Sequence, residues 1–424
     1  MDRPGVHGKA RLFFSIPAAP CYRQPMARRL TLDFLKTESG AGLLLAAAAV
    51  AAVLMANSPW AGSYFAFIAW PIDLRLGDFA QSRTVLSWVK DGLMAIFFLV
   101  VGMEIKFEVL RGELSSPRRL ALPVLAALGG MIAPTLIYLA VNLGPGGAPR
   151  GWPIGAATDI AFALAALAVA APRLPAALRV FLLTVAIADD LGAVALIAIL
   201  FTAKVHAVSL AGAGLALAAV ALLSRWKRAP FAFYAVGFLV VWGFTLESGV
   251  NTSIAGVACA LTVPIGARRA GQEGVLKYFM DSLHPYVAFA ILPLFAFAAA
   301  GFSFQGLGAH QLVSSVPLGI VLALAVGKPI GVFGFSLLAA GLRVGRRPTG
   351  TTWWELLGVA MLCGVGFTMS LFIGALAFDA GDGLAQTQAR LGVIAGSLAS
   401  VLTGGALLAW AQVRRARRGE NGVD

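Results

Sequence analysis

The chain has 424 residues, of which 59% are hydrophobic and only 12% are charged. Soluble domains carry about 25% charged residues, so this composition excludes an ordinary soluble protein. The net charge of +13 would suggest nucleic acid as the partner of a soluble protein, but in a membrane protein it reflects the enrichment of Lys and Arg in cytoplasmic loops. We therefore expect a lipid bilayer, and no nucleic acid, around this chain.

The two ends of the chain differ from its apolar middle. Residues 1–30 are basic and are expected to form a poorly ordered leader without a convincing secretory signal, and both Met1 and Met26 remain open as the start of translation. A transmembrane domain is predicted over residues 31–415, and residues 416–424 would form a cytoplasmic tail.

Apolar runs recur along almost the whole chain. About 20 apolar residues are enough for a helix to cross a bilayer. The pattern predicts an all-α polytopic membrane protein with twelve transmembrane helices. The predicted spans are 39–56, 86–107, 120–142, 152–170, 180–203, 207–224, 230–246, 248–265, 285–302, 313–341, 355–378 and 389–411.

The loops between these spans differ in their content of Lys and Arg. The loops on the side of the two termini hold 25 of the 33 Lys and Arg residues, against six on the opposite side. Because positively charged loops stay in the cytoplasm, we expect both termini there, in a multi-pass protein of the inner membrane.

The long outer connection over residues 57–85 contains the segment WPIDLRLGDFA. Apolar and polar residues alternate from Ile72 to Gly77, which is typical of a strand, and turn residues follow. A short β-hairpin on the membrane surface is the favoured interpretation, and an irregular loop is the alternative. A hairpin at residues 70–80 could pair with a second copy and form a homodimer.

Two spans carry helix-breaking and polar residues inside an apolar run. GWPIGAATDIAF begins at Gly151, and LCGVGFTMSLF begins at Leu362. These spans are the middle members of two triplets, spans 3–5 and spans 10–12, which start on opposite sides of the membrane. Matching interruptions in oppositely oriented triplets predict an inverted repeat, with the substrate site where the two broken helices cross at mid-membrane.

Four charged residues lie clearly at mid-membrane, namely Asp159, Asp189, Asp190 and Lys328. Each costs at least ~2.5 kcal/mol at the centre of a membrane helix, so each needs a function or a partner. A purely structural ion-pair network is the plainer interpretation, but three acids and one base leave surplus negative charge. Adjacent residues on a helix point about 100° apart, so Asp189 and Asp190 cannot share one binding direction, and one can face a cavity while the other faces a neighbouring helix.

Such a site can hold either protons or a hard cation. A carboxylate in an apolar environment favours its protonated form, while a nearby Lys or a bound cation favours the ionised form. Competition between H⁺ and Na⁺ for one site is by itself an exchange mechanism. No cofactor is required.

Seven motifs, in order along the chain, carry a resemblance to a known family. They are GLMAIFFLVVGMEIK, ATDIAFALA, AIADDLGAVALIAILF, SGVNTSIAGV, LHPYVAFAILPLFAFA, GKPIG and GVGFTMSLFIGALAF. Together they resemble the NhaA-type sodium/proton antiporters of bacterial inner membranes, from about Thr31 to about Arg415. The inverted repeat inferred above is itself a known property of this family.

The resemblance implies a role for each buried polar residue. Asp190 of the ADD motif is implied as the principal cation ligand and proton carrier, and Asp189 as the acid that pairs with Lys328 until the cation arrives. Together with Asp190, Asp189 and Thr158 are implied as oxygen ligands of a transient Na⁺ or Li⁺. Asp159, at the crossing of the broken helices, would offset the positive ends of their dipoles.

The family also has an acidic pair at its cytoplasmic mouth, matched here by Glu104 and Glu108. A solvated helix face is the plainer interpretation of this pair. Asp281 could take the place of an acid displaced from the mouth, and His284 is expected to be satisfied within a loop rather than to bind a proton.

This chain departs from its family at several positions linked to alkaline activation. Asn251 stands where many relatives have His, Met280 and Asp281 replace an acid–His pair, and relatives commonly have Arg at Phe107 and Asn at Ala299. The resemblance places these positions around the cytoplasmic funnel. Because His is the side chain that titrates near neutral pH, their loss leaves pH dependence mainly to the ion site.

The sequence therefore predicts an electrogenic Na⁺(Li⁺)/H⁺ antiporter that expels sodium for Na⁺ and pH homeostasis. A sodium-coupled organic-anion symporter of similar architecture is the alternative, although it would need a roomier site and no buried Lys. An intramembrane aspartyl protease would need its two aspartates on separate helices, and it gives Lys328 no role.

Overall fold

The computed structural model describes residues 38–76, 79–112, 117–202, 205–224, 231–266, 274–305, 308–378 and 381–418. All of them belong to one unit that begins at Glu38. The predicted leader, both candidate start positions and residues 419–424 lie outside the described residues.

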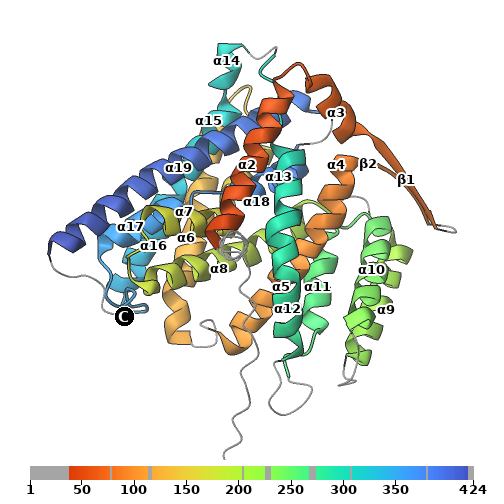
Figure 1. Cartoon of the computed structure of the whole chain (residues 1–424), viewed down its shortest axis with the longest axis horizontal. Helices are drawn as coiled ribbons and strands as arrows, with labels where there is room; N and C mark the ends of the chain where they lie inside the picture. Colours follow the sequence, from red (N-terminus) through yellow and green to blue (C-terminus); the bar gives the residue numbers. More distant parts are fainter. Residues whose placement is uncertain are drawn as a thin grey trace, which may run out of the picture. The chain divides into compact units, whose positions relative to one another are not determined.

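Helices make up almost the whole unit (Figure 1). The uninterrupted ones are α2 (Glu38–Ala56), α6 (Pro117–Asn142), α8 (Ala176–Leu200), α9 (Ala207–Leu223), α10 (Phe231–Ser248), α11 (Ser253–Thr262) and α19 (Gly383–Arg417). α3 (Ala61–Ala69) and α14 (Ala309–Leu312) are short.

Three further helices contain a single π-helical turn. They are α4 (Val85–Trp88), η1 (Val89–Leu93) and α5 (Met94–Arg111); α12 (Val275–Tyr286), η4 (Val287–Ile291) and α13 (Leu292–Ala300); and α15 (Ser315–Leu322), η5 (Ala323–Gly327) and α16 (Lys328–Gly341). A π-helical turn inserts one extra residue into a helix and is frequent at functional sites. One of these turns ends directly before Lys328.

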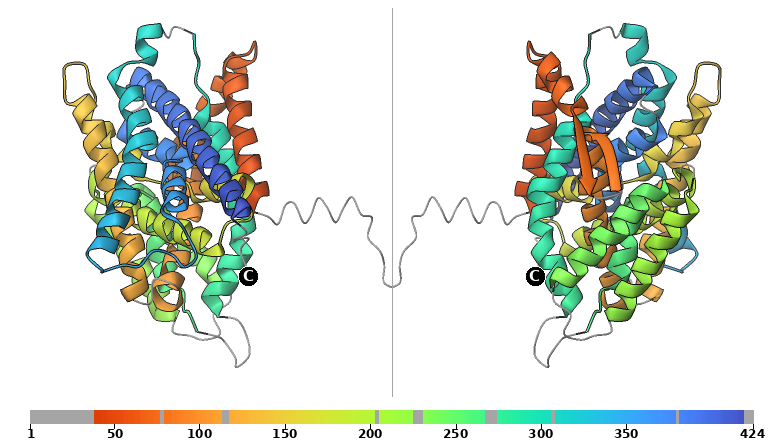
Figure 2. Two further views of the ribbon diagram at one scale, coloured as in Figure 1. Left: turned by 90° about the vertical axis from the view of Figure 1, so that its left-hand side faces the viewer. Right: turned by 90° about the vertical axis from the view of Figure 1, so that its right-hand side faces the viewer.

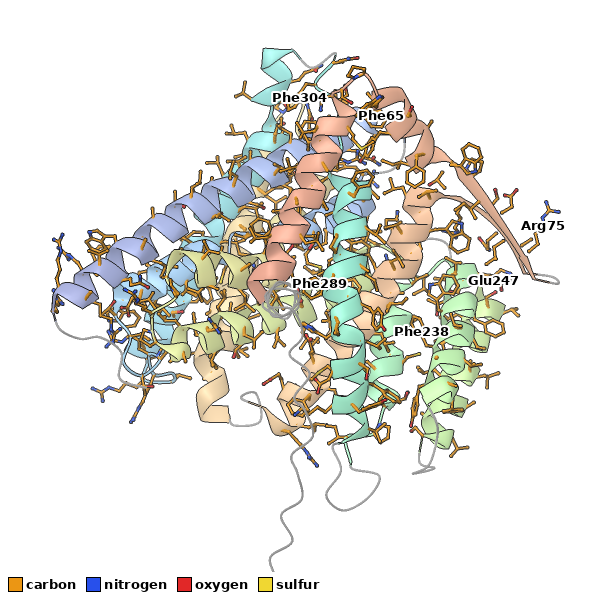
Figure 3. The ribbon with its side chains drawn as sticks, viewed as in Figure 1. Phe65, Arg75, Phe238, Glu247, Phe289 and Phe304 are labelled. Atoms are coloured by element: carbon orange, nitrogen blue, oxygen red, sulfur yellow. The ribbon has the colours of Figure 1, made fainter. Side chains whose placement is uncertain are left out.

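The apolar helices have the lengths that a membrane requires. In the described ranges, five helices are long and apolar enough to cross a bilayer, or up to eight if each of three sharply bent pairs is one span. Shorter apolar helices, α9, α10 and α11, accompany them. Large apolar side chains also remain exposed, with Phe65 36% and Phe304 48% accessible (Figure 3), as expected where the solvent is lipid rather than water.

Two helical segments differ from the sequence-based expectation. The helix predicted over 285–302 begins ten residues earlier, at Val275. The prediction missed this start because the stretch VLKYFMDSLHPY is amphipathic and its mean hydropathy is low. The outer connection contains α3, whose Tyr64 is buried and donates a hydrogen bond to the Phe297 carbonyl at 2.6 Å. This contact fixes the outer connection against α13.

A two-stranded antiparallel hairpin follows α3. β1 (Pro71–Leu76) pairs with β2 (Phe79–Thr84), with Pro71 opposite Thr84 and Leu76 opposite Phe79. The hairpin lies along one flank of the helices (Figure 2). Thr84 then caps α4, because its hydroxyl accepts a hydrogen bond from the Ser87 amide.

Two helices are broken in the middle, at the motifs that contain Gly, Pro and polar residues. The 3₁₀ helix η3 (Pro149–Ala156) and α7 (Ile160–Ala170) meet at 49°, and α17 (Trp353–Leu362) and α18 (Phe367–Ala377) meet at 43°. The two breaks touch, since the Asp159 amide donates a hydrogen bond to the Val365 carbonyl at 2.7 Å.

The unbroken helices α6 and α16 pack closely through glycines. A Cβ atom added to Gly331 would collide with backbone atoms of Gly129, and one added to Gly130 would lie 2.8 Å from the Val332 side chain and 3.6 Å from the Lys328 ammonium. Small residues allow membrane helices such a close approach. The glycines therefore make the space that the Lys328 side chain occupies.

Candidate functional site

The Asp159 carboxylate accepts hydrogen bonds at the starts of two helices. Asp159 immediately precedes α7, and its Oδ1 accepts a hydrogen bond from the Phe162 amide at 3.0 Å. Its Oδ2 accepts from the Thr368 amide of α18 at 3.0 Å and from the Thr368 hydroxyl. Helix starts carry partial positive charge, so a buried acid at their junction is electrostatically favourable.

The neighbouring acids on α8 face in different directions. Asp189 is fully buried and forms an ion pair with Lys328, with 2.5 Å between Oδ2 and Nζ. The Lys328 ammonium also donates to the Ala156 carbonyl at 2.7 Å, at the end of η3. The Thr158 hydroxyl lies 2.8 Å from both the Asp189 Oδ2 and the Cys363 carbonyl, and its single hydrogen can serve only one of them at a time.

Asp190 points instead into a large cavity. The cavity encloses about 1260 Å³, including its open mouth, and its inner end is lined by Asp190, Asp159 and Thr368. Asp190 is 1% exposed, and within the described structure its Oδ1 has no hydrogen-bond partner. Asp189 and Thr158 are not among the lining residues, so the cavity reaches one acid of the adjacent pair and not the other.

The lining of the cavity is mainly apolar, and its polar residues are few. Glu104 and Glu108 of α5 line the cavity together with His284 of α12. The two acids therefore come from one helix, and α12 adds His284. Asp281 is exposed and is not among the lining residues.

The expectation that His284 lies in a loop was wrong. His284 belongs to α12 rather than to a loop, because the helix continues through Pro285 into the π-helical turn η4. A wider turn of this kind accommodates a proline within a helix. The His284 side chain borders the same cavity as Asp190.

The resemblance links several positions to alkaline activation, and only some of them line this cavity. Phe107 and Met280 line it, but Asn251 and Ala299 do not. The Asn251 side chain accepts a hydrogen bond from the Ser253 amide at the start of α11, which is a turn-forming role, and Ala299 borders a separate pocket.

Thr368 is a site residue that the sequence analysis did not assign. Its hydroxyl and its amide both contact Asp159, and its side chain lines the cavity beside Asp190. The signal was available in the sequence, because Thr368 is a polar residue in the second broken helix, as Thr158 is in the first.

The polar lining residues nearest to Asp190 in the fold offer oxygen atoms rather than nitrogen or sulfur. In the described part of the chain, no group of three or more His, Cys, Asp or Glu residues is placed to hold a resident metal ion. The Asp190 carboxylate supplies oxygen ligands of the kind that a hard cation prefers, whereas both oxygens of Asp159 already accept hydrogen bonds from Phe162 and Thr368.

Comparison with known proteins gives a consistent family assignment. Residues 32–408 match the family model described as Na⁺/H⁺ antiporter 1. A protein of Rhodospirillum rubrum named Na(+)/H(+) antiporter NhaA is 48% identical over 387 residues, which cover 89% of this chain and 96% of that protein. Na(+)/H(+) antiporter NhaA 1 of Syntrophotalea carbinolica is 45% identical and covers 92% of this chain and 98% of its own length. Na(+)/H(+) antiporter NhaA of Bordetella parapertussis is 46% identical, with 90% and 96% covered.

Apolar helices of membrane-spanning length and a cavity lined by buried acids define the class as a multi-pass membrane transport protein. The match extends over nearly the whole chain, and the chain belongs to the Na⁺/H⁺ antiporter 1 family. Its members are secondary transporters and not enzymes, which excludes the protease interpretation.

Proposed function

We propose that this protein exchanges Na⁺ or Li⁺ for H⁺ across the membrane, with Asp190 as the principal cation ligand and proton carrier. One observation carries the proposal: a buried carboxylate with an unpartnered oxygen faces an open cavity, while the adjacent carboxylate is paired with Lys328. The relatives named above are all called Na⁺/H⁺ antiporters, which supports the same pair of ions.

The exchange follows from competition for Asp190. An entering cation displaces the Asp190 proton and draws its other ligands from oxygens close by, including Asp189 and Thr158. Recruiting Asp189 breaks its ion pair with Lys328, and Asp159 keeps the two helix starts in place meanwhile. On the opposite side of the membrane the cation leaves, protons return, and the ion pair forms again.

We further propose that transport is electrogenic. If one monovalent cation displaces two protons, unequal charge crosses the membrane in each cycle. The second proton comes from Asp189 or from Lys328, and coupled titration makes this assignment a property of the pair. Exchange in liposomes that neither generates nor responds to a membrane potential would contradict the claim.

The proposed architecture has twelve spans and an inverted repeat of spans 3–5 and 10–12. The two broken helices, whose breaks lie in contact, support the repeat, as does the packing of α6 on α16, the first helices of the two triplets. An even number of spans puts both termini on one side, and the Lys and Arg distribution favours the cytoplasm. A reporter fused after Arg418, active only in the cytoplasm, tests the orientation.

The membrane is proposed to be a bacterial inner membrane, with residues 31–415 as the transporting domain and residues 57–85 on its outer side. The hairpin β1–β2 is a pairing element for a homodimer, because in a two-stranded sheet each strand has a neighbouring strand on one side only. Arg75 projects from the hairpin away from the helices (Figure 3). Cross-linking of single cysteines placed at Arg75 tests this dimer.

Glu104, Glu108 and Asp281 are proposed as regulatory residues of the cytoplasmic mouth. Glu104 and Glu108 have the stronger support, since both line the cavity that ends at Asp190. Asp281 lies one turn from His284 on α12 but does not line the cavity, so its support is weaker.

The test is Na⁺-induced dequenching of a ΔpH-sensitive dye in everted vesicles. Asp190→Asn should abolish exchange, because it removes a titratable ligand without changing the volume of the side chain. Asp382→Asn, at an exposed carboxylate near the start of α19, is the matched control and should exchange ions like the unchanged protein. Full Na⁺/H⁺ exchange by Asp190→Asn would overturn the assignment.

A further inference from the structure

A second polar pocket lies between the first turn of α17 and the last turns of α19, two elements that lie side by side (Figure 1). It encloses about 560 Å³ and shares no residue with the ion cavity. Its principal lining residues are Trp354, Glu355, Trp410, Arg414, Arg415 and Arg418. Ion exchange as proposed above uses none of them.

The pocket has a fixed back wall. The Arg415 guanidinium forms an ion pair with the buried Glu355 at 3.1 Å and donates to the Gly350 carbonyl at 2.9 Å. Glu355 in turn forms a reciprocal cap with Thr352 at the start of α17. These contacts neutralise Glu355 and tie the end of α19 to α17.

Two exposed arginines of the pocket carry positive charges that the described carboxylates do not offset. Arg414 and Arg418 are exposed, and neither contacts a carboxylate among the residues that the structure describes. Since Arg415 offsets Glu355, the pocket carries a surplus of two positive charges. A guanidinium binds phosphate oxygens in a bidentate manner, which makes an anionic phosphate ester the matching ligand.

The aromatic residues of the pocket indicate where this ligand comes from. Trp354 is 56% and Trp410 is 42% exposed, and their rings meet edge to face at 6.1 Å. The Arg414 guanidinium lies 4.3 Å from the centre of the Trp410 ring. Exposed tryptophans beside basic residues are typical of the membrane–water interface, where lipid headgroups lie.

The apolar surface of α19 continues from the pocket towards the middle of the helix. Val413 is 50% and Leu402 is 62% exposed on the same helix as the three arginines. A lipid acyl chain could lie along these side chains while its headgroup occupies the pocket. A soluble phosphate would gain nothing from them.

We propose that this pocket binds the headgroup of an anionic phospholipid, with Arg414 and Arg418 contacting the phosphate and Trp354 and Trp410 contacting the glycerol and upper acyl region. The lipid contacts both α19 and α17, which is the first half of one broken helix of the ion site. The inference does not depend on the ion that the protein transports.

Native mass spectrometry of the full-length protein in detergent tests the proposal, with dioleoyl-phosphatidylglycerol as the anionic probe and dioleoyl-phosphatidylcholine as the zwitterionic one. The unchanged protein should retain phosphatidylglycerol in preference, and its melting temperature should rise with this lipid. The double variant Arg414→Gln/Arg418→Gln should retain one phosphatidylglycerol fewer per chain and lose at least half of that rise. Arg414→Lys/Arg418→Lys should recover part of both effects, since the charge is kept.

The matched control is Arg343→Gln/Arg346→Gln, which removes two exposed arginines outside the pocket. It should behave like the unchanged protein. Equal retention of phosphatidylglycerol by the Arg414/Arg418 double variant and the unchanged protein would overturn the proposal, and so would an equal loss in the control. If inorganic phosphate raises the melting temperature as much as the lipid does, the site is one for a soluble anion and the proposal of a lipid is wrong.

Discussion

Removing Lys328 alone should destabilise the protein more than removing Lys328 and Asp189 together. Both side chains are 0% exposed, and their charged atoms are 2.5 Å apart. Lys328→Met leaves a buried carboxylate whose Oδ1 already has no partner in the described structure. Breaking one partner of a buried pair costs about 3–5 kcal/mol, whereas replacing both is often nearly neutral. We expect a residual cost of about 1–3 kcal/mol in the double variant, since the Ala156 carbonyl loses its donor.

The assay is equilibrium unfolding in mixed micelles with increasing denaturing detergent, at one pH, for the unchanged protein, Lys328→Met, Asp189→Asn and the double variant. The coupling free energy should reach at least about 2 kcal/mol. The same cycle on Arg83 and Asp91 is the control, because this pair, at 2.8 Å, has side chains 30% and 15% exposed and should couple by about 1 kcal/mol or less. Additive effects at Lys328 and Asp189 would refute the reasoning, as would a coupling no larger than that of the control pair.

Three more predictions concern packing, the junction of the broken helices and pH. Gly331→Ala should lower the free energy of unfolding by at least about 1–3 kcal/mol, because the added Cβ atom meets the backbone of α6. Gly334 has open space around it, so Gly334→Ala should be neutral or slightly stabilising in the same unfolding assay. Thr368→Val removes a hydroxyl bound to Asp159 and should destabilise by about 1.5–3 kcal/mol and slow exchange in vesicles, whereas Thr403→Val, at an exposed hydroxyl bound to its own helix, should do neither; equal effects would contradict a special role for the junction. Because Na⁺ and H⁺ compete at Asp190, saturating Na⁺ should shift the pH profile of exchange towards lower pH, and an unmoved profile would require a separate pH sensor.

Helix periodicity and hydropathy were sufficient to predict that the two adjacent buried acids differ in their surroundings, and the family resemblance indicated which of them pairs with Lys328. Two adjacent acids in the middle of one apolar helix must face different sides, and the structure has Asp190 at the cavity and Asp189 at Lys328. The breaks at the Gly- and Pro-containing motifs were equally visible, because such residues weaken a helix wherever they occur.

The remaining features depend on contacts between distant segments. The burial of Tyr64 on α3 depends on its contact with α13, which no local pattern reports, whereas the first part of α12 has an amphipathic pattern that a search for purely apolar runs passes over. The hydrogen bonds from Thr368 to Asp159 join residues 209 positions apart. The π-helical turn before Lys328 has no distinct composition, since ALAVG would suit an ordinary helix equally well.

The apolar wall of the ion cavity has a consequence for the rate of transport. An apolar wall does little to screen charge, so whenever Asp190 is ionised its field extends through the cavity, and ionised Glu104 and Glu108 would reinforce it. We expect cations to be concentrated in this way near the site before they bind. The site can then be filled rapidly at a low bulk concentration of cation without holding it tightly, and a short residence time is what a carrier that must release its ion in every cycle requires.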